Sequence, residues 1–338
     1  MARASSDLHA SHTRTIWLAM GAVYVIWSTT YLAIRVVDET LPPLVAAGIR
    51  FLIAGAVLFA LTVRREDRAG DRLGRPQWRA SAIVGLLLIV GGNGGVVWAE
   101  TRIASGIAAL IFATVPLWLV LLDRVVFGHR QGRAVTTGVV LGFAGTAALV
   151  GGSAAVGHVD LLGMLVVLFG TLCWASGSLY QRQAPLPSRP FVAAGMEMMI
   201  GGAALVAVGA LTGELGSIDP STFSRASLIA LAYLVVFGSW IGFTSYLWLL
   251  RNARTSLVST YAYVTPAGAV FLGWLVLGEP IGPRTLVAGA MILAAVAIIV
   301  RAGGAAREPS DAREERRSEL EPELGLEGVG GGEERGLA

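Results

Sequence analysis

Three ionisable side chains lie within or at the end of long apolar stretches, where they could hold a proton or attract a charged solute. Arg50 and Glu197 each lie inside such a stretch, and Glu100 ends another one. A charge at membrane depth is costly, so such residues are functional candidates by default. Arg50 and Glu197 could instead hydrogen-bond the carbonyls of neighbouring helices as structural contacts, and Glu100 could be an interfacial cap beside Arg102. We interpret the three as candidates for charged gates or for proton coupling.

Aromatic and small polar side chains recur in the same stretches and could line a cavity for a solute. Aromatic rings can stack on apolar or cationic groups, and hydroxyl and amide groups supply hydrogen bonds. Some of the aromatic residues would instead form an interfacial belt, and Ser and Thr often bond back to their own helix. The cavity candidates are Trp27, Tyr31, Asn93, Trp98, Thr114, Trp174, Ser178, Trp240, Tyr246, Tyr261 and Tyr263.

Two prolines are predicted to interrupt helices at mid-depth. Pro116 and Pro266 fall near the centres of their stretches, where proline removes one backbone hydrogen bond and kinks a helix. The freed carbonyls could bind a polar solute, or the breaks could act only as hinges. We treat both as helix-break candidates.

Residue usage argues against several kinds of chemistry. All 26 basic residues are arginine, so a phosphate-binding P-loop and a Schiff-base site have no lysine. Cys173 is the single cysteine, and the four histidines are scattered over polar segments, so neither a disulfide nor a metal site is expected. No Ser-His-Asp set lies in the apolar stretches. We therefore expect no enzymatic activity, catalytic residue, metal, cofactor or nucleic-acid partner.

The elements that position these residues are membrane-spanning helices. The chain is 54% hydrophobic and 14% charged, with a mean hydropathy of +0.66, values that favour contact with lipid along most of its length. Stretches of about 20 apolar residues have the length needed to cross the bilayer. The predicted spans are Trp17–Val37, Pro42–Val63, Arg79–Trp98, Ser105–Phe127, Ala134–Val150, Leu161–Gln181, Phe191–Leu211, Ala226–Leu250, Ser256–Leu277 and Arg284–Val300.

Arginine counts predict the orientation of these spans. Twelve arginines lie in the loops after the second, fourth, sixth and eighth spans, against four on the other side. Positive residues concentrate on the cytoplasmic side, which predicts that both termini are cytoplasmic. The segment from Ala302 onward is rich in Glu and Gly and is predicted to be disordered.

The sequence also contains an internal repeat. VAAGIRFLIAGAVL (Val45–Leu58) and VAAGMEMMIGGAAL (Val192–Leu205) match at eight of fourteen positions with a shift of 147. The same shift relates Trp27 to Trp174, and a shift of 150 relates Gly92 to Gly242 and Trp98 to Trp248. Duplicating five helices, an odd number, inverts the second copy in the membrane, an arrangement typical of alternating-access carriers. The duplication could also have built only a larger bundle.

The fold class predicted is an all-α membrane protein with ten transmembrane helices in two inverted five-helix repeats. The predicted parts are an N-terminal cytoplasmic tail (1–14), a first repeat (15–150), a second repeat (151–301) and a disordered cytoplasmic tail (302–338).

Several segments together resemble a known family. They are WSTTYLAIR (27–35), RFLIAGAVL (50–58), GGNGGVVWAE (91–100), SGIAALIFATVPLW (105–118) and TPAGAVFLGWLVLGEPI (265–281). They are similar to the EamA-type exporters of the drug/metabolite transporter superfamily, and the WAE and ATVPLW wording is most similar to the YedA-like branch. The resemblance covers about residues 17–301. It implies a prokaryotic inner-membrane carrier that exports amino acids, related metabolites or drugs.

The functional hypothesis is a secondary exporter of small organic solutes that works by alternating access. Its expected partners are a small-molecule substrate and the lipid bilayer, and protons if Glu100 and Glu197 couple transport to a proton gradient. The alternatives are an uncoupled facilitator or channel on the same fold and a membrane-embedded transferase, for which paired carboxylates or histidines at one interface are missing.

Overall fold

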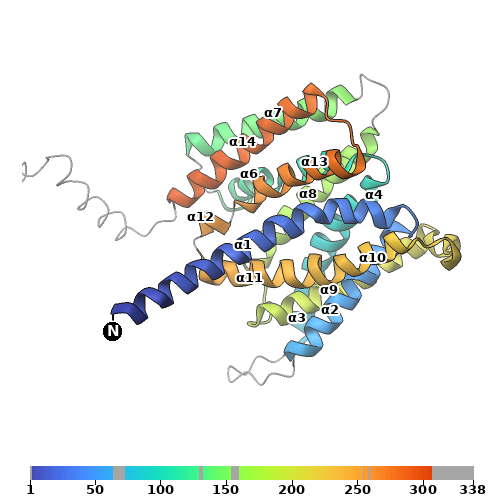
Figure 1. Cartoon of the computed structure of the whole chain (residues 1–338), viewed down its shortest axis with the longest axis horizontal. Coiled ribbons are helices and arrows are strands. Elements are labelled where there is room, and N and C mark those ends of the chain that lie inside the picture. Colours follow the sequence, from blue (N-terminus) through green and yellow to red (C-terminus); the bar gives the residue numbers. More distant parts are fainter. Residues whose placement is uncertain are drawn as a thin grey trace, which may run out of the picture.

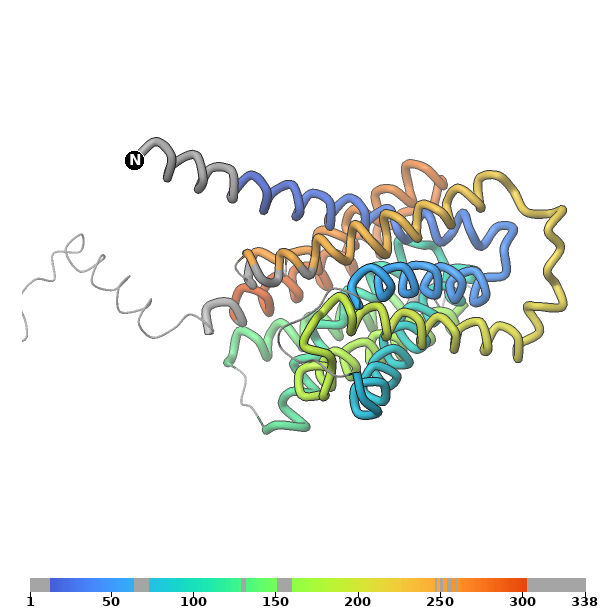
Figure 2. Tube along the Cα trace, turned by 90° about the horizontal axis from the view of Figure 1, so that it is seen from below, coloured from blue at the N-terminus to red at the C-terminus, as the bar shows by residue number. Residues whose placement is uncertain are grey.

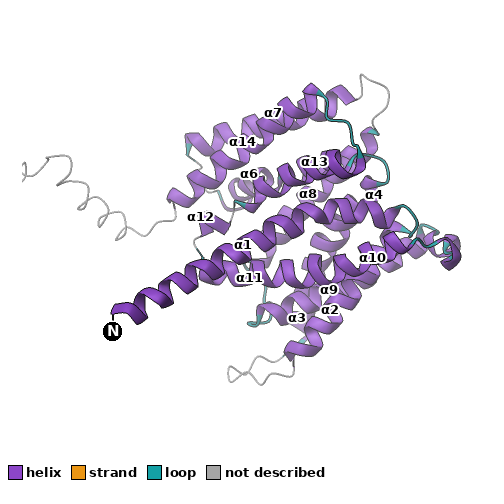
Figure 3. Cartoon of the chain, in the orientation of Figure 1, coloured by secondary structure: helices purple, strands orange, loops and turns teal. Residues whose placement is uncertain are grey.

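The chain folds into a bundle of helices (Figure 1), seen in a computed structural model that describes residues 2–63, 73–128, 132–153, 160–253, 255–258 and 260–306. Every regular element in these ranges is helical (Figure 3). Among them, nine helices are long and apolar enough to cross a membrane, and a further apolar helix, Tyr261–Leu277, is shorter. A helix satisfies its own backbone hydrogen bonds, as a segment in lipid must. The predicted all-α membrane fold is confirmed.

The first half of the chain contains the elements α1 (Ala2–Asp38), α2 (Pro43–Val63), α3 (Arg75–Gly85), η1 (Leu86–Gly94), α4 (Gly95–Glu100), α5 (Ser105–Phe112), α6 (Val115–Phe127) and α7 (Arg133–Ser153). The second half contains α8 (Leu161–Gln181), α9 (Pro190–Leu211), η2 (Glu214–Ser217), η3 (Pro220–Thr222), α10 (Arg225–Tyr233), η4 (Leu234–Ile241), α11 (Gly242–Asn252), α12 (Thr255–Val258), α13 (Tyr261–Leu277) and α14 (Pro283–Ala306).

Two helix ends at matching places in the two halves require glycine. Gly128 follows α6 with φ of 71° and Gly278 follows α13 with φ of 66°. This left-handed conformation is the common way to end a helix, and glycine adopts it without steric cost. The two glycines are separated by the repeat shift of 150, so both halves end the same helix in the same way.

The third and eighth predicted spans contain wider turns that the sequence did not indicate. Arg75–Glu100 is built from α3, the π-helical segment η1 and α4, and the eighth span is built from α10, the π-helical segment η4 and α11. Long π-helical segments are rare and are frequently found at functional sites. They overlap under the repeat, because the shift of 150 relates residues 86–91 of η1 to residues 236–241 of η4.

The predicted ends of the chain and the ninth span differ from the structure. Helix α1 continues back to Ala2, through most of the predicted N-terminal tail. The ninth predicted span, which was to begin at Ser256, is divided into α12 and α13, and α13 begins at Tyr261. Helix α14 continues to Ala306, and the rest of the predicted disordered tail lies outside the described residues.

The two prolines do not produce the predicted pair of symmetric breaks. The fourth span is interrupted between α5 and α6, and Pro116 lies at the start of α6, where a missing N–H costs no helical hydrogen bond. Pro266 instead lies inside the continuous helix α13. Next to it, the Thr265 carbonyl accepts a hydrogen bond from Ser28 Oγ of α1 at 3.2 Å, the kind of neighbouring contact that lets a membrane helix tolerate proline.

Helices α2 and α9 pack against each other through glycines related by the repeat. A Cβ atom built on Gly48 would lie 2.7 Å from the Gly202 carbonyl oxygen, and one on Gly55 would lie 2.8 Å from the Gly195 carbonyl oxygen. The shift of 147 converts the first pair into the second with the roles exchanged. The two helices are therefore antiparallel around a pseudo-twofold axis, as inverted repeats require, and small residues allow the close backbone approach.

The outside of the bundle is apolar, and its charges gather at the ends. Large apolar side chains such as Leu211 (88% exposed), Leu18 (65%) and Phe169 (63%) point outward. We call the end of the bundle that carries Asp38, Glu100, Asp160, Glu214 and Glu279 the acidic end. The segment between α9 and α10 projects there, beyond the rest of the bundle (Figure 2).

Candidate functional site

Three of the predicted cavity residues form an aromatic cluster between the two halves. Trp27 of α1 lies 5.2 Å from Tyr246 of α11 and 5.0 Å from Tyr261 of α13, measured between ring centroids. The two tyrosine rings are 5.4 Å apart in an edge-to-face arrangement. Such geometry is favourable between aromatic rings, and the rings remain only half-buried.

The two tryptophans related by the repeat make matching contacts with opposite halves. The Trp27 Nε1 atom would lie 2.7 Å from a Cβ atom built on Gly242, and the Trp174 Cε3 atom would lie 2.8 Å from one built on Gly92. Each tryptophan therefore packs directly against backbone at or just after the π-helical segment of the other half. We call these two pairs the crossed tryptophan contacts. Trp174 also makes an edge-to-face contact with Phe112 of α5, with 5.4 Å between centroids.

Most of the predicted polar candidates hydrogen-bond locally. Thr114 Oγ1 donates to the Ile111 carbonyl at 2.7 Å and lies 3.4 Å from Thr171 Oγ1 of α8. Asn93 Nδ2 donates to the Leu88 carbonyl in its own π-helical segment at 3.3 Å. These groups are thus largely satisfied by the protein, as Ser and Thr often are in helices.

Ser178 and Tyr263 are half-buried on α8 and α13, and neither side chain hydrogen-bonds another described residue. Trp240 Nε1 donates to the Ala54 carbonyl of α2 at 3.0 Å, which fixes it at the contact between the halves. Tyr31 packs against a cluster of buried apolar side chains. Tyr31 lies one helical turn after Trp27 on α1 and interacts electrostatically with Tyr261, so it borders the aromatic cluster, whereas no ring contact joins Trp240 or Tyr263 to it among the described residues.

The two charges inside the bundle lie apart. Arg50 is 5% exposed, and its Nε donates to Ser239 Oγ of η4 at 3.0 Å while its guanidinium carbon lies 4.7 Å from the centroid of the Phe51 ring. Glu197 is also 5% exposed, and its Oε1 has no hydrogen-bond partner. Its backbone carbonyl faces Gly85, directly before η1. Each residue therefore lies against the helix that contains the π-helical segment of the opposite half.

The charged residues at the acidic end include one that sequence reasoning missed. Glu100 is fully buried, and neither of its carboxylate oxygens has a hydrogen-bond partner. Asp38, at the end of α1, has both carboxylate oxygens buried without a partner. Arg35 Nη1 donates to the backbone carbonyl of Glu100. Asp38 marked only the end of an apolar stretch in the sequence, and nothing there indicated that its carboxylate would be enclosed.

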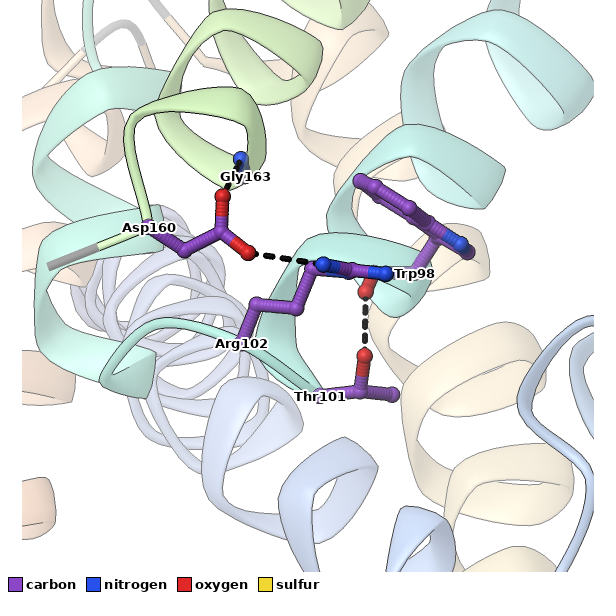
Figure 4. Close-up of polar contacts among 5 residues, drawn as sticks. All are labelled: Trp98, Thr101, Arg102, Asp160 and Gly163. Atoms are coloured by element: carbon purple, nitrogen blue, oxygen red, sulfur yellow. Dashed lines mark hydrogen bonds and ion pairs between the residues drawn. The ribbon is translucent and has the colours of Figure 1, made fainter.

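Arg102 does not cap Glu100, as one alternative supposed. It forms an ion pair with Asp160, with 2.7 Å between Nη1 and Oδ2, and its guanidinium lies 4.3 Å from the centroid of the Trp98 ring (Figure 4). The side-chain hydrogen bond from Arg102 and the backbone N–H of Gly163 hold the pKa of Asp160 below its ordinary value. Trp98 therefore belongs to this exposed contact at the acidic end.

Two other carboxylates at this end cap helices of the opposite half. Glu214 accepts hydrogen bonds from the N–H groups of Leu44, at 3.3 Å, and Val45, at 2.9 Å, at the start of α2. Glu279 accepts from Ser105, at 2.8 Å, and Gly106, at 3.1 Å, at the start of α5. Negative side chains are favourable at helix N-termini, where backbone N–H groups are otherwise unsatisfied.

Within the described ranges, no three His, Cys, Asp or Glu side chains are grouped closely enough to hold a metal ion. The described part of the interior instead contains aromatic surfaces between the halves, the buried Arg50, and the buried carboxyl groups of Glu100 and Glu197.

Comparisons with known proteins match both halves of the chain to one family. The model of the EamA-like transporter family matches residues 13–151 and again residues 161–301. The inner membrane transporter YedA of Escherichia coli K12 is 37% identical over 282 residues, which cover 83% of this chain and 89% of YedA. A protein of Salmonella typhimurium LT2 named "Probable amino-acid metabolite efflux pump" is 24% identical over 296 residues, covering 82% of this chain and 92% of its own length.

One crystal structure of a protein has the same fold, with a TM-score of 0.55 and 22% sequence identity, over 86% of this chain and 97% of that one. The family matches point to transporters and not to enzymes, and the YedA relative together with the apolar helices places the chain among multi-pass inner membrane proteins. The chain belongs to the EamA-like transporter family.

Proposed function

We propose that this transporter is a secondary exporter of small organic solutes that works by alternating access between two inverted five-helix repeats, residues 15–150 and 151–301. The observation that carries the proposal is the crossed tryptophan contacts, Trp27 with Gly242 and Trp174 with Gly92. Each half contributes one ring to the other, so a rocking motion around the pseudo-twofold axis can exchange the environments of the two rings. Equivalent halves around a shared site are the usual basis of alternating access.

The two halves differ at a pair of arginines that the repeat relates, and this difference supports a bundle in which the two ends are in different states. Arg35 bonds to the Glu100 carbonyl at the acidic end, where helix C-terminal carbonyls attract positive charge. Its repeat counterpart, Arg182, is exposed, and its guanidinium makes no hydrogen bond with a described residue. Two copies of one unit in two different states are what an alternating-access carrier has in each of its end states.

The proposed substrate site lies between the aromatic cluster of Trp27, Tyr246 and Tyr261 and the Trp174 side of the interface, with Arg50 close to η4. Aromatic surface with one enclosed cation suits amphipathic solutes that carry a carboxylate. The printed name of the Salmonella relative, an amino-acid metabolite efflux pump, describes solutes of this chemistry. We therefore propose amino acids and related metabolites as the first substrates to test.

The proposed orientation places both termini in the cytoplasm and the acidic end outside. It depends on the arginine asymmetry of the loops, part of which lies outside the described residues. In this orientation the acidic end is the proposed closed side, because Glu214 and Glu279 of the second half cap α2 and α5 of the first half there.

The test is transport of a panel of labelled amino acids and metabolites by the purified chain in proteoliposomes, with and without a proton gradient. Tyr261→Ala should lower transport of any substrate found, since it removes one face of the aromatic cluster. Phe271→Ala is the matched control, because that side chain is an aromatic residue of the same helix that is 54% exposed on the outside. Equal loss in both variants would contradict the proposed site.

Closure at the acidic end has its own test. In a chain without native cysteine, a cysteine placed at buried Ile34 should react slowly with a membrane-impermeant thiol reagent and faster after Arg35→Gln. Arg182→Gln is the matched control and should leave the rate unchanged. If Arg35→Gln also leaves it unchanged, the Arg35 contact does not hold this end closed.

An uncoupled facilitator on the same fold remains the second candidate. Proton antiport would move protons against substrate, whereas a facilitator would move substrate only down its own gradient. A pH-sensitive dye inside the proteoliposomes distinguishes the two.

A further inference from the structure

Two enclosed carboxyl groups at the acidic end lack any hydrogen bond. Glu100 has no exposed surface, and all four carboxylate oxygens of Glu100 and Asp38 are buried without a partner. An ionised carboxylate in such a place costs several kcal/mol unless a counter-charge and hydrogen bonds compensate it. The charge of these two groups must therefore be balanced from within the cluster.

Arg35 can balance one of the two charges. It lies on α1 three residues before Asp38, which puts both side chains on one face of the helix. It interacts electrostatically with Asp38 and with Glu100, and its guanidinium donates to the Glu100 carbonyl. One arginine and two ionised carboxylates would leave one uncompensated negative charge inside the protein. One arginine, one carboxylate and one carboxylic acid are neutral.

The groups that face the pair do not supply a second positive charge. Glu279 interacts electrostatically with Glu100, and Glu214 interacts electrostatically with Asp38. Both are acidic side chains that accept hydrogen bonds at helix N-termini, so neither can supply a positive charge. Tyr31 faces Glu100 from α1. Arg102 is the basic residue nearest to Glu100 in sequence, but its guanidinium is paired with Asp160 and stacked on Trp98.

We propose that Asp38 and Glu100 form a single proton-binding site, which holds one shared proton while the acidic end is closed and exchanges it with water when that end opens. The proton would bind as the acidic hydrogen of one carboxyl group, with Arg35 compensating the other. Only the use of this proton in transport rests on the proposed exporter function. The presence of the proton does not depend on it.

This site differs from the pairing of Glu100 with Glu197 expected from the sequence. Glu197 is enclosed by the packing of α9 against α3, and no ionisable group in the described part of the chain interacts with it. A lone carboxyl group without a neighbouring charge has nothing to alter its protonation as the halves move, whereas Asp38 and Glu100 are tied to Arg35, which joins two helices.

Infrared spectroscopy of the purified full chain tests the proposal, because a protonated carboxyl group has its own C=O absorption. At neutral pH, Asp38→Asn, Glu100→Gln and the double variant should each lose the same one carboxylic acid absorption, since either single change leaves one carboxylate to balance Arg35. Arg35→Gln should add one, because the remaining carboxylate then loses its counter-charge. Asp160→Asn is the matched control and should change nothing, because that exposed aspartate is ionised.

Two results would overturn the proposal. One is a carboxylic acid absorption that stays unchanged in both Asp38→Asn and Glu100→Gln. The other is the absence of any protonated carboxyl group at neutral pH in Glu197→Gln, a variant that leaves Asp38 and Glu100 unchanged. This variant tests the proposal even if changes at Asp38 or Glu100 prevent folding. Since the measurement needs no substrate, a chain that transports but lacks the absorption loses only the proton site. A chain that shows the absorption but transports nothing loses only the exporter function.

Discussion

The glycine contacts between α2 and α9 make a quantitative prediction about stability. A methyl group added at Gly48 would meet Val206 Cγ2 at 2.6 Å, the Gly202 carbonyl oxygen at 2.7 Å and the Val206 nitrogen at 2.8 Å. Two of these atoms are backbone and cannot rotate away, so the helices must separate. Overpacking of this kind costs about 1–3 kcal/mol.

Gly21 provides the matched control for Gly48→Ala. It also lies in the middle of a membrane helix, α1, but a Cβ atom there would meet nothing within 4 Å. Gly21→Ala should therefore gain about 1 kcal/mol from helix propensity alone. Gly48→Ala also replaces glycine by alanine within a helix, so this gain applies to both variants. They are therefore expected to differ by the overpacking cost, about 1–3 kcal/mol in free energy of unfolding.

The assay is reversible unfolding in mixed micelles with a graded denaturing detergent, followed by circular dichroism. By the pseudo-twofold relation, Gly195→Ala should lose about as much as Gly48→Ala, because its methyl group would lie 2.9 Å from the Phe59 nitrogen. If Gly48→Ala unfolds at the same point as Gly21→Ala, the close antiparallel packing described here is incorrect.

Three further predictions concern topology, charge and pH. In a chain without native cysteine, a cysteine at Arg72 should label from the cytoplasm and one at Ser217 from outside, and labelling of both from one side would rule out the ten-span arrangement. Arg50→Gln and Glu197→Gln should each reduce export at unchanged membrane insertion, because each removes an enclosed charge or acid while keeping most of its shape; normal rates in transport assays would make both residues structural. The hydrogen bond from Arg102 and the backbone N–H of Gly163 lower the folded-state pKa of Asp160 from 3.8. The ion pair of Figure 4 therefore stabilises the fold above pH 3.8 and loses this contribution as the pH falls through the lowered pKa. The stability difference between Asp160→Asn and the unmodified chain, measured by detergent unfolding, should be present at neutral pH and shrink in acid.

The sequence predicted the features that depend on composition and spacing. Apolar length alone locates the spans, because the thickness of the bilayer leaves little freedom. The repeat indicated which residues would correspond, and the matching contacts of Gly48 and Gly55 with α9 follow that correspondence. It also related Trp27 to Trp174, although the glycines against which they pack followed only from the structure.

Features that depend on the path of neighbouring backbones were not predictable in this way. Nothing in LLLIVGGNG or LVVFGSWI distinguishes a π-helical turn from an α-helical one, since both are apolar and glycine-containing. Asp38 lies just beyond the first predicted span, and its enclosure depends on helices distant in sequence. Thr114 and Asn93 were expected to face a cavity, yet each has a carbonyl of its own chain segment within hydrogen-bond distance. The candidate substrate residues stay predictions until a substrate is bound.

The matching of η1 and η4 bears on the history of the chain. A π-helical turn accommodates an additional residue within a helix, and such turns are rare. Two of them at overlapping positions of the repeat are most simply explained by a single insertion that preceded the duplication. The ancestral five-helix unit would then already have carried the wide turn. For two separate copies of that unit to pair as α2 and α9 now do, they would have had to insert into the membrane in opposite directions.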